Sequence, residues 1–213
     1  MSTLAGTATG VVLGGGQSRR MGRSKAALMM DGEPLLGRIT ARLLSAVPEV
    51  LVVGPRELAE LAPGVKVVPD LHPGVGPLGG IETALLAMTG ELAFVTACDM
   101  PFLNPDLVTA MLNYFPAAEA DVDVVALAGE GLFMEHLHAV YRRAACLGPI
   151  ADLIAAHDYA LHHLFARLRV KVFPTDMAAR IDPGGLSTRN VNTPAEWLDA
   201  IAISADLARS ERS

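Results

Sequence analysis

The sequence predicts an α/β fold, as a single three-layer domain with a mostly parallel, doubly wound sheet. Short apolar runs bounded by glycine, proline or aspartate alternate with segments whose apolar residues have helical spacing. The chain has 213 residues, of which 51% are hydrophobic, and no apolar run approaches the ~18 residues of a membrane span. We therefore expect the apolar runs to be buried parallel strands.

The first half of the chain is expected to alternate strands and helices. The expected strands are 11–13, 50–53, 65–68 and 92–97. The expected helices are 33–47, a turn at 57–61, 79–88 and 104–115. Pro34 should lie in the first turn of its helix, while Asn104 should be an N-cap with Pro105 in first position.

The second half is less regular. Strands are expected at 122–127, 137–141 and 170–173, and helices at 144–156, 159–168 and 195 to about 207. A loop is expected at 178–188, and residues 208–213 should be frayed. The domain should span residues 8–207, with halves of about 8–115 and 116–207.

A glycine loop with dense positive charge follows the first expected strand. Leu13 ends the apolar run, and then come Gly14, Gly15 and Gly16, followed by Arg19, Arg20, Arg23 and Lys25. Backbone N–H groups and forked arginine donors in one loop are typical of a polyphosphate site. The sequence does not match the dinucleotide-binding fingerprint, because Arg19 stands where that motif has its third glycine. It does not match the P-loop motif either, because the spacing of the glycines differs and the lysine of that motif is missing.

Charge and cysteine content limit the class of protein. The net charge is −6, which argues against a nucleic-acid-binding protein and against a broad basic face. Residues 1–9 have no secretory signal pattern, and Cys98 and Cys146 are too few for a disulfide framework. A cytoplasmic protein with no membrane partner is expected.

Two aspartates follow expected strands at the edge where open α/β sheets bind ligands. Asp99 could hold Mg²⁺ against nucleotide phosphates, because Mg²⁺ takes one or two carboxylates plus phosphate oxygens. Asp70 could accept a hydrogen bond from the nucleotide. The alternative for both is a turn or capping aspartate. Six histidines are present, and His136 and His138 should share a strand face, but none has zinc-ligand spacing.

The segment 13–25 resembles the signature Leu-x-Gly-Gly-x-x-x-Arg-Met-Gly-x-x-Lys of nucleotidyltransferases with a glycosyltransferase-A-like fold. Within them it is most similar to the molybdenum cofactor guanylyltransferases of the MobA type. Cys-Asp-Met-Pro-Phe-Leu at 98–103, Gly-Pro-Leu-Gly-Gly-Ile at 76–81 and Asn-Val-Asn-Thr-Pro at 190–194 also resemble motifs of that family. The sequence departs from it at Ser24, where many relatives have Asp, and at Gly54, where several have Asn.

The resemblance implies transfer of GMP from Mg·GTP to molybdopterin, with release of pyrophosphate. Molybdopterin-insertion proteins and an acceptor molybdoenzyme are the further partners it implies. We expect the catalytic residues to be Arg19, Lys25 and Asp99, with Asp99 as the metal ligand. The expected nucleotide-binding residues are Leu13, Gly14, Gly15, Gly16, Lys25, Gly54, Asp70, Gly76, Pro77, Leu78, Asp99 and Asn192. For Asn192, a helix cap formed by Thr193 and Pro194 is a compatible structural interpretation.

Three alternatives stay open at this point. The first is a cytidylyltransferase for molybdopterin, since Gly54 leaves the base preference in doubt. The second is a nucleotidyltransferase that acts on a sugar or another small phosphate. The third is a GTP-binding cofactor carrier without turnover, which the presence of Arg19, Lys25 and Asp99 disfavours.

Overall fold

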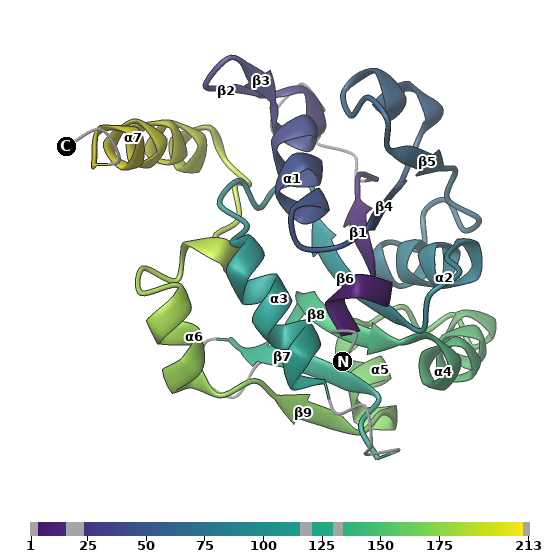
Figure 1. The fold of residues 1–213 in the computed structure, drawn as a ribbon. Helices are drawn as coiled ribbons and strands as arrows, with labels where there is room; N and C mark the ends of the chain where they lie inside the picture. Colours follow the sequence, from purple (N-terminus) through teal and green to yellow (C-terminus); the bar gives the residue numbers. More distant parts are fainter. Residues whose placement is uncertain (1–3, 16–23, 116–120, 130–133, 211–213) are drawn as a thin grey trace.

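A seven-stranded sheet forms the centre of the computed structural model, which describes residues 4–15, 24–115, 121–129 and 134–210 (Figure 1). The strand order is β5-β4-β1-β6-β8-β7-β9. The strands are β1 (Thr9–Leu13), β4 (Glu49–Val53), β5 (Lys66–Val68), β6 (Leu92–Ala97), β7 (Val124–Ala128), β8 (Met134–Arg142) and β9 (Val170–Val172). Strand β8 is antiparallel to β6 and β7, and the other neighbouring pairs are parallel. The predicted mostly parallel sheet is therefore confirmed.

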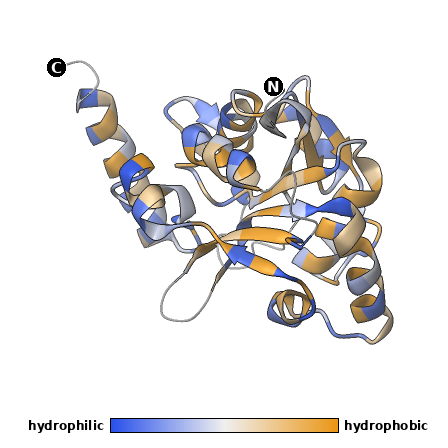
Figure 2. Ribbon diagram, turned by 60° about the horizontal axis from the view of Figure 1, so that its bottom comes forward, coloured by the Kyte–Doolittle hydropathy of each residue, from blue (hydrophilic) through white to orange (hydrophobic). Residues whose placement is uncertain are grey.

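Helices cover both faces of the sheet. Helices α1 (Leu35–Leu44), α3 (Pro105–Tyr114) and α6 (Thr175–Ile181) pack on one face. Helices α2 (Pro77–Ala87), α4 (Arg143–Ala155) and α5 (Leu161–Arg167) pack on the other. In β1, Val12 contributes to the first core and Val11 to the second, and both are fully buried. Much of the central sheet is accordingly hydrophobic (Figure 2).

The C-terminal helix α7 (Pro194–Ser210) lies beside this three-layer body (Figure 1). It is attached through a small third core that contains Met30, Phe102, Val191 and Ala200. Met30 belongs to a short hairpin of β2 (Met29–Met30) and β3 (Glu33–Pro34). The Ser204 hydroxyl donates to Asp31 in the turn of that hairpin, over 2.5 Å. Residues from both ends of the chain thus meet in one cluster.

Three expected boundaries are wrong. The helix expected at 33–47 begins only at Leu35 and ends at Leu44, because Glu33 and Pro34 pair with β2 instead. The loop expected at 178–188 contains the end of α6, which is amphipathic enough for Ala178 and Ile181 to pack on the core. Helix α7 continues through Ser210, where fraying was expected, and residues 211–213 lie outside the described ranges.

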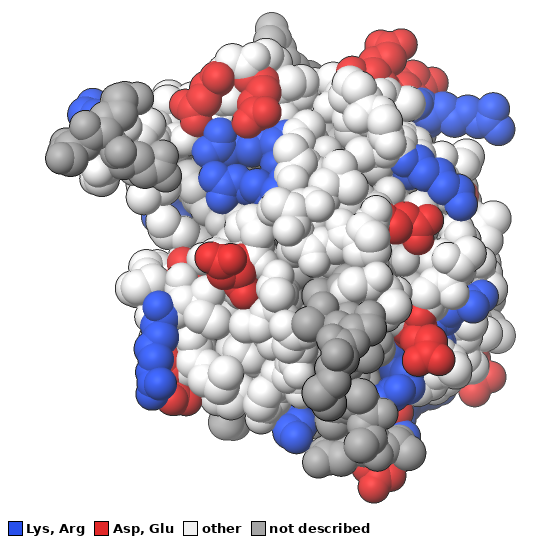
Figure 3. All heavy atoms as spheres, in the orientation of Figure 1, with Lys and Arg blue, Asp and Glu red and all other residues white. Residues whose placement is uncertain are grey.

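Short 3₁₀ helices connect several strands and helices. They are η1 (Leu4–Thr7), η2 (Lys25–Ala27), η3 (Arg56–Glu60) and η4 (Leu186–Thr188). Among the described helices, none combines the length and apolar character needed to cross a membrane. On the face drawn in Figure 3, several basic side chains lie next to acidic ones. Arg38 forms ion pairs with Asp31 and Glu33.

The order of connections reverses at β1. After β1 the chain enters β4 and then β5 on one side, and it returns through α2 to β6 on the other side. In doubly wound sheets such a reversal opens a crevice at the carboxyl ends of the strands, which is where ligands bind. The carboxyl ends of β1, β4, β5 and β6 therefore form the expected ligand-binding edge.

Candidate functional site

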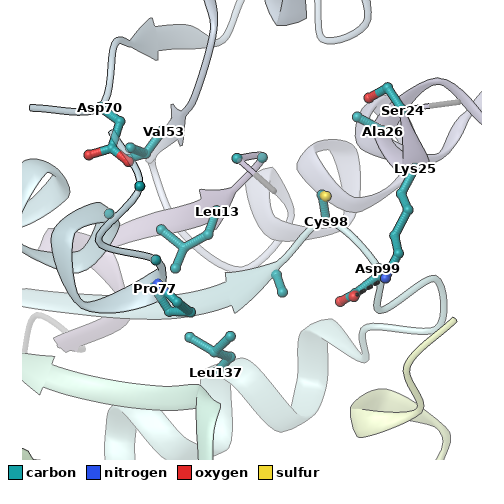
Figure 4. Close-up of a pocket in the computed structure, with 16 residues that line it drawn as sticks. Leu13, Ser24, Lys25, Ala26, Val53, Asp70, Pro77, Cys98, Asp99 and Leu137 are labelled. Atoms are coloured by element: carbon teal, nitrogen blue, oxygen red, sulfur yellow. Dashed lines mark hydrogen bonds and ion pairs between the residues drawn. The ribbon is translucent and has the colours of Figure 1, made fainter. Parts of the chain in front are cut away.

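A pocket of about 680 Å³ opens at this edge of the sheet (Figure 4). Such a volume is typical of sites for small molecules and cofactors. The described lining residues come from strand ends and from the loops that follow them: Leu13, Gly14, Gly15, Ser24, Lys25, Ala26, Val53, Asp70, Gly74, Gly76, Pro77, Gly80, Ala97, Cys98, Asp99 and Leu137. Eight of the residues predicted from the sequence are in this set.

The turn after β1 exposes backbone to the pocket. Gly14 N–H donates to Val53 O over 2.9 Å, and the Cys98 N–H donates to Leu13 O over 3.1 Å. These bonds hold the turn between the ends of β4 and β6. A Cβ atom at Gly15 would meet nothing within 4 Å, so the open side of the turn faces free space. The turn therefore leaves room for a ligand against its main chain.

Gly54 lies behind this turn and outside the pocket lining. A Cβ atom there would stand 3.3 Å from the backbone of Gly14 and Gly15, and 2.8 Å from the Leu58 side chain. The absence of a side chain at this position lets β4 pass close to the glycine turn. A role for Gly54 in nucleotide binding would therefore act through the position of Gly14 and Gly15.

Lys25 joins two polar residues on one side of the pocket. Its ammonium nitrogen lies 2.8 Å from Oδ2 of Asp99 and 2.6 Å from Oδ1 of Asn192 (Figure 4 shows the pair with Asp99). The side chains of Lys25 and Asp99 are 16% and 19% exposed, so the ion pair is only partly screened by water. Asn192 contacts Lys25 without lining the pocket.

The donor set around Lys25 suits a small divalent cation. Asp99 offers a carboxylate and Asn192 an amide oxygen, and both converge on the place that the lysine ammonium holds. Hard oxygen ligands of this kind suit Mg²⁺, which keeps several waters and takes phosphate oxygens as further ligands. In the described part of the chain, no three His, Cys, Asp or Glu residues form a metal-binding group.

The N-terminus of α7 holds Asn192 in place. The Glu196 carboxylate accepts the N–H groups of Asn192 (2.5 Å) and Thr193 (3.0 Å), and the Thr193 hydroxyl accepts the Glu196 N–H (3.2 Å). This is a capping box, and it confirms the predicted cap at Thr193 and Pro194. The Asn192 N–H bond is the main reason why the pKa of Glu196 lies below its ordinary value.

The other side of the pocket is formed by Asp70 and the start of α2. In the view of Figure 4, Asp70 lies across the pocket from Lys25 and Asp99. Its Oδ1 accepts the His72 N–H over 2.9 Å and the Thr83 hydroxyl over 3.3 Å. Gly74 and Gly76 have positive φ angles of 93° and 82°, which glycine adopts without strain, so the loop can turn sharply into α2.

Strand β8 supplies Leu137, and no other described lining residue comes from the second half of the chain. The register between β7 and β8 shifts between Ala126 and Ala128, which marks an irregularity near Leu137. Such bulges redirect side chains at the rim of a site. The alternation of polar and apolar residues along this strand does not predict the irregularity.

The same irregularity overturns the expectation that His136 and His138 share a face. His136 packs on Phe165 of the second core, and His138 packs on Phe94 of the first. Burial lowers the pKa of His138 to about 3, so its imidazole is neutral, with Nε2 3.3 Å from the Ser187 hydroxyl.

Cys98 lines the pocket but is not an activated nucleophile. Burial raises the pKa of its thiol to about 12, and the neighbouring Asp99 carboxylate adds to the effect. A thiol that stays protonated at neutral pH is a poor nucleophile. The residue is 9% exposed, so Cys98 is a small, largely buried residue.

Leu78 is not among the described lining residues, because it is fully buried in the second core. Gly16 and Arg19 lie outside the described residues. The expected binding residues did not include Val53, Gly74, Gly80 or Leu137. A signal was present for Val53, which ends an expected strand, and for Gly80, which belongs to the motif at 76–81.

Comparisons with known proteins find similarity over most of the chain. The model of the MobA-like NTP transferase domain matches residues 10–172. A probable molybdenum cofactor guanylyltransferase of Pelotomaculum thermopropionicum is 34% identical over 205 residues, which are 96% of this chain and 97% of that protein. A molybdenum cofactor guanylyltransferase of Desulfosudis oleivorans is 32% identical over 190 residues, covering 88% and 91% of the two chains.

A solved structure is similar over nearly its whole length. It is the molybdopterin-guanine dinucleotide biosynthesis protein A of Archaeoglobus fulgidus, with a TM-score of 0.79 and 25% identity. The match covers 93% of this chain and 99% of the other. The similarity therefore extends beyond the motifs to the arrangement of the whole domain.

Proposed function

The chain belongs to the MobA-like NTP transferase family and is a nucleotidyltransferase, and we propose that it transfers GMP from GTP to molybdopterin. Pyrophosphate is the other product. The proposal is supported above all by the cluster of Lys25, Asp99 and Asn192 beside the glycine turn, since it joins a cation to oxygen ligands at the ligand-binding edge of the sheet. The names of the relatives supply the base and the acceptor.

The two sides of the pocket suggest how GTP is oriented. We assign the triphosphate to the side with Gly14, Gly15 and Lys25, where main-chain N–H groups and an ammonium group favour negative charge. The nucleoside then extends towards Asp70, Gly76 and Pro77. Gly16 and Arg19, outside the described ranges, stay predicted phosphate ligands.

Lys25 and Asp99 have separate roles in the proposed reaction. Lys25 moves from Asp99 to the phosphates and stabilises the charge that develops at the α-phosphate. A divalent cation held by Asp99 and phosphate oxygens, with Asn192 as a further oxygen ligand, would neutralise charge on the leaving pyrophosphate. The acceptor phosphate of molybdopterin is already ionised at neutral pH, so alignment and charge neutralisation suffice without a general base.

The acceptor is assigned to the second half of the domain, residues 116–207, with the nucleotide in residues 8–115. Leu137 supports the assignment of the acceptor to the second half, because this residue brings β8 of that half to the rim of the nucleotide pocket. Contacts with molybdopterin-insertion proteins or an acceptor molybdoenzyme stay predictions from the family resemblance.

Pyrophosphate release from GTP, CTP and ATP, each with Mg²⁺, tests the proposal directly. The assay is run with and without molybdopterin. Release from GTP only when molybdopterin is present is the expected result. Preference for CTP would reassign the base, and release with another phosphate acceptor would reassign the acceptor. Tight GTP binding without any release would indicate a carrier and refute the proposed activity.

A further inference from the structure

Glu82 is an acidic residue in the core side of α2, and its side chain is only 10% exposed. A buried carboxylate is costly unless it is paired. The partner is His72, whose Nε2 lies 2.5 Å from Oε2 of Glu82. The pair joins the second turn of α2 to the loop that precedes the helix. Asp70, Gly74 and Gly76 of that segment line the nucleotide pocket.

Further contacts order the loop around His72 and bring it close to the helix. Its N–H donates to Asp70 Oδ1 over 2.9 Å, and its carbonyl accepts the Val75 N–H over 3.1 Å. A Cβ atom at Gly79 would stand 2.8 Å from the His72 Cβ, so the helix approaches the loop closely only because this residue is glycine. His72 is thus held by main chain and side chain at once.

We propose that His72 and Glu82 are positioning residues that clasp the loop 70–76 to α2 and thereby set the wall of the nucleotide pocket. The inference rests on the proposed function, since it assigns this wall to the nucleoside of GTP. The two glycines of the loop can adopt many conformations. A side-chain clasp restricts them before the nucleotide arrives, which lowers the entropic cost of binding. The clasp acts on nucleotide affinity, and the group transfer itself is left to Lys25 and Asp99.

The test uses Glu82→Gln, His72→Ala and the double variant, with GTP affinity measured by calorimetry and turnover by pyrophosphate release. Each single variant should weaken GTP binding about tenfold, with kcat within about twofold of the wild type. The double variant should be no weaker than the singles, because both remove the same clasp. Amide hydrogen exchange at His72 and Val75 should be faster in all three proteins without nucleotide.

Asp158→Asn is the matched control. Asp158 also pairs with a histidine, His163, at 2.7 Å, but it does not line the pocket. This variant should keep the wild-type affinity for GTP. Unchanged affinity in Glu82→Gln and His72→Ala, or weakening that adds up fully in the double variant, would overturn the inference. A lower melting temperature with normal affinity would do the same, since it indicates a merely structural pair.

The proposed function can fail separately. A wild-type protein that binds GTP without releasing pyrophosphate refutes the transferase activity, while the affinity comparison still decides whether the clasp exists. Normal turnover in the wild type together with unaffected variants refutes the clasp alone.

Discussion

The ammonium group of Lys25 lies 2.8 Å from the carboxylate of Asp99, although the two residues are 74 positions apart in the sequence. One follows the glycine turn after β1 and the other follows β6, so the adjacency of these two strands brings the residues together. The lysine ammonium neutralises the Asp99 carboxylate. Lysine is a compact point charge on a flexible stem, which allows it to change partners when an anion enters.

Replacing Lys25 by alanine should reduce turnover far more than it reduces stability. The variant loses the positive charge that we expect to stabilise the negative charge developing at the α-phosphate. Such a loss typically costs 10²–10³ in kcat. Asp99 keeps contact with water, so the fold should remain intact. Pyrophosphate release and thermal unfolding measure the two effects.

Lys66→Ala is the control for this experiment. Lys66 donates to the Ala87 carbonyl at an exposed position, so its loss should leave turnover unchanged. Near-normal rates in Lys25→Ala would remove Lys25 from the mechanism.

Replacing Asp99 by asparagine should weaken the dependence on a divalent cation. The amide keeps the size of the side chain but loses the charge, and Mg²⁺ binds carboxylates in preference to neutral oxygens. The half-saturating Mg²⁺ concentration, titrated by calorimetry with GTP present, should rise at least about tenfold. A metal titration identical to that of the wild type would make Asp99 a turn residue held by Lys25.

Local signals predicted most of the first half of the fold. The strand 92–97 has the predicted bounds, because a continuous apolar run between polar residues is buried on both faces. Asn104 caps α3, and its Oδ1 accepts the N–H groups of Asp106 and Leu107. Strand burial and capping depend on neighbours in sequence, so a single sequence reveals them.

Contacts between segments that are distant in the sequence could not be predicted from it. Lys25 and Asn192 are 167 positions apart, and no periodicity relates them. Strand β3 falls inside the helix expected at 33–47, since Pro34 suits both a helix N-terminus and the residue before one. The pairing of Glu82 with His72 is likewise visible only once α2 and its loop have been placed together.

Both cysteines should resist alkylation in the folded protein. Burial is the main reason why the pKa of each thiol is raised to about 12, and the reactive thiolate is therefore scarce at pH 8. Less than about one tenth of either residue should react with iodoacetamide in an hour, whereas both should react fully in urea. Mass spectrometry locates the label. Rapid labelling of Cys98 in the native protein would show that the pocket exposes an activated thiol.

The last prediction concerns the buried acid Asp123, which anchors the start of β7 to Arg169. The carboxylate accepts the Arg169 main-chain N–H and two guanidinium N–H groups over 2.7–3.0 Å. The side-chain hydrogen bonds from Arg169 are the main reason why the pKa of Asp123 lies below its ordinary value of 3.8. Because the folded state releases this proton more readily than the unfolded chain, the pair stabilises the protein above about pH 4. That stability is lost as the pH falls through the folded pKa.

Asp123→Asn should therefore lower the free energy of unfolding at pH 7 by about 1–2 kcal/mol. The expected loss is modest because the Arg169 side chain is half exposed, so water screens the ion pair. The difference from the wild type should begin to shrink below about pH 4 and should disappear only once the pH has fallen through the folded pKa, where Asp123 becomes neutral. Urea unfolding at pH 7, 5 and 3.5 measures it. Asp121→Asn is the matched control, since Asp121 pairs with the same arginine but is 88% exposed, and it should change little at any pH. Equal effects of the two substitutions at pH 7 would show that burial of Asp123 adds nothing to the pair.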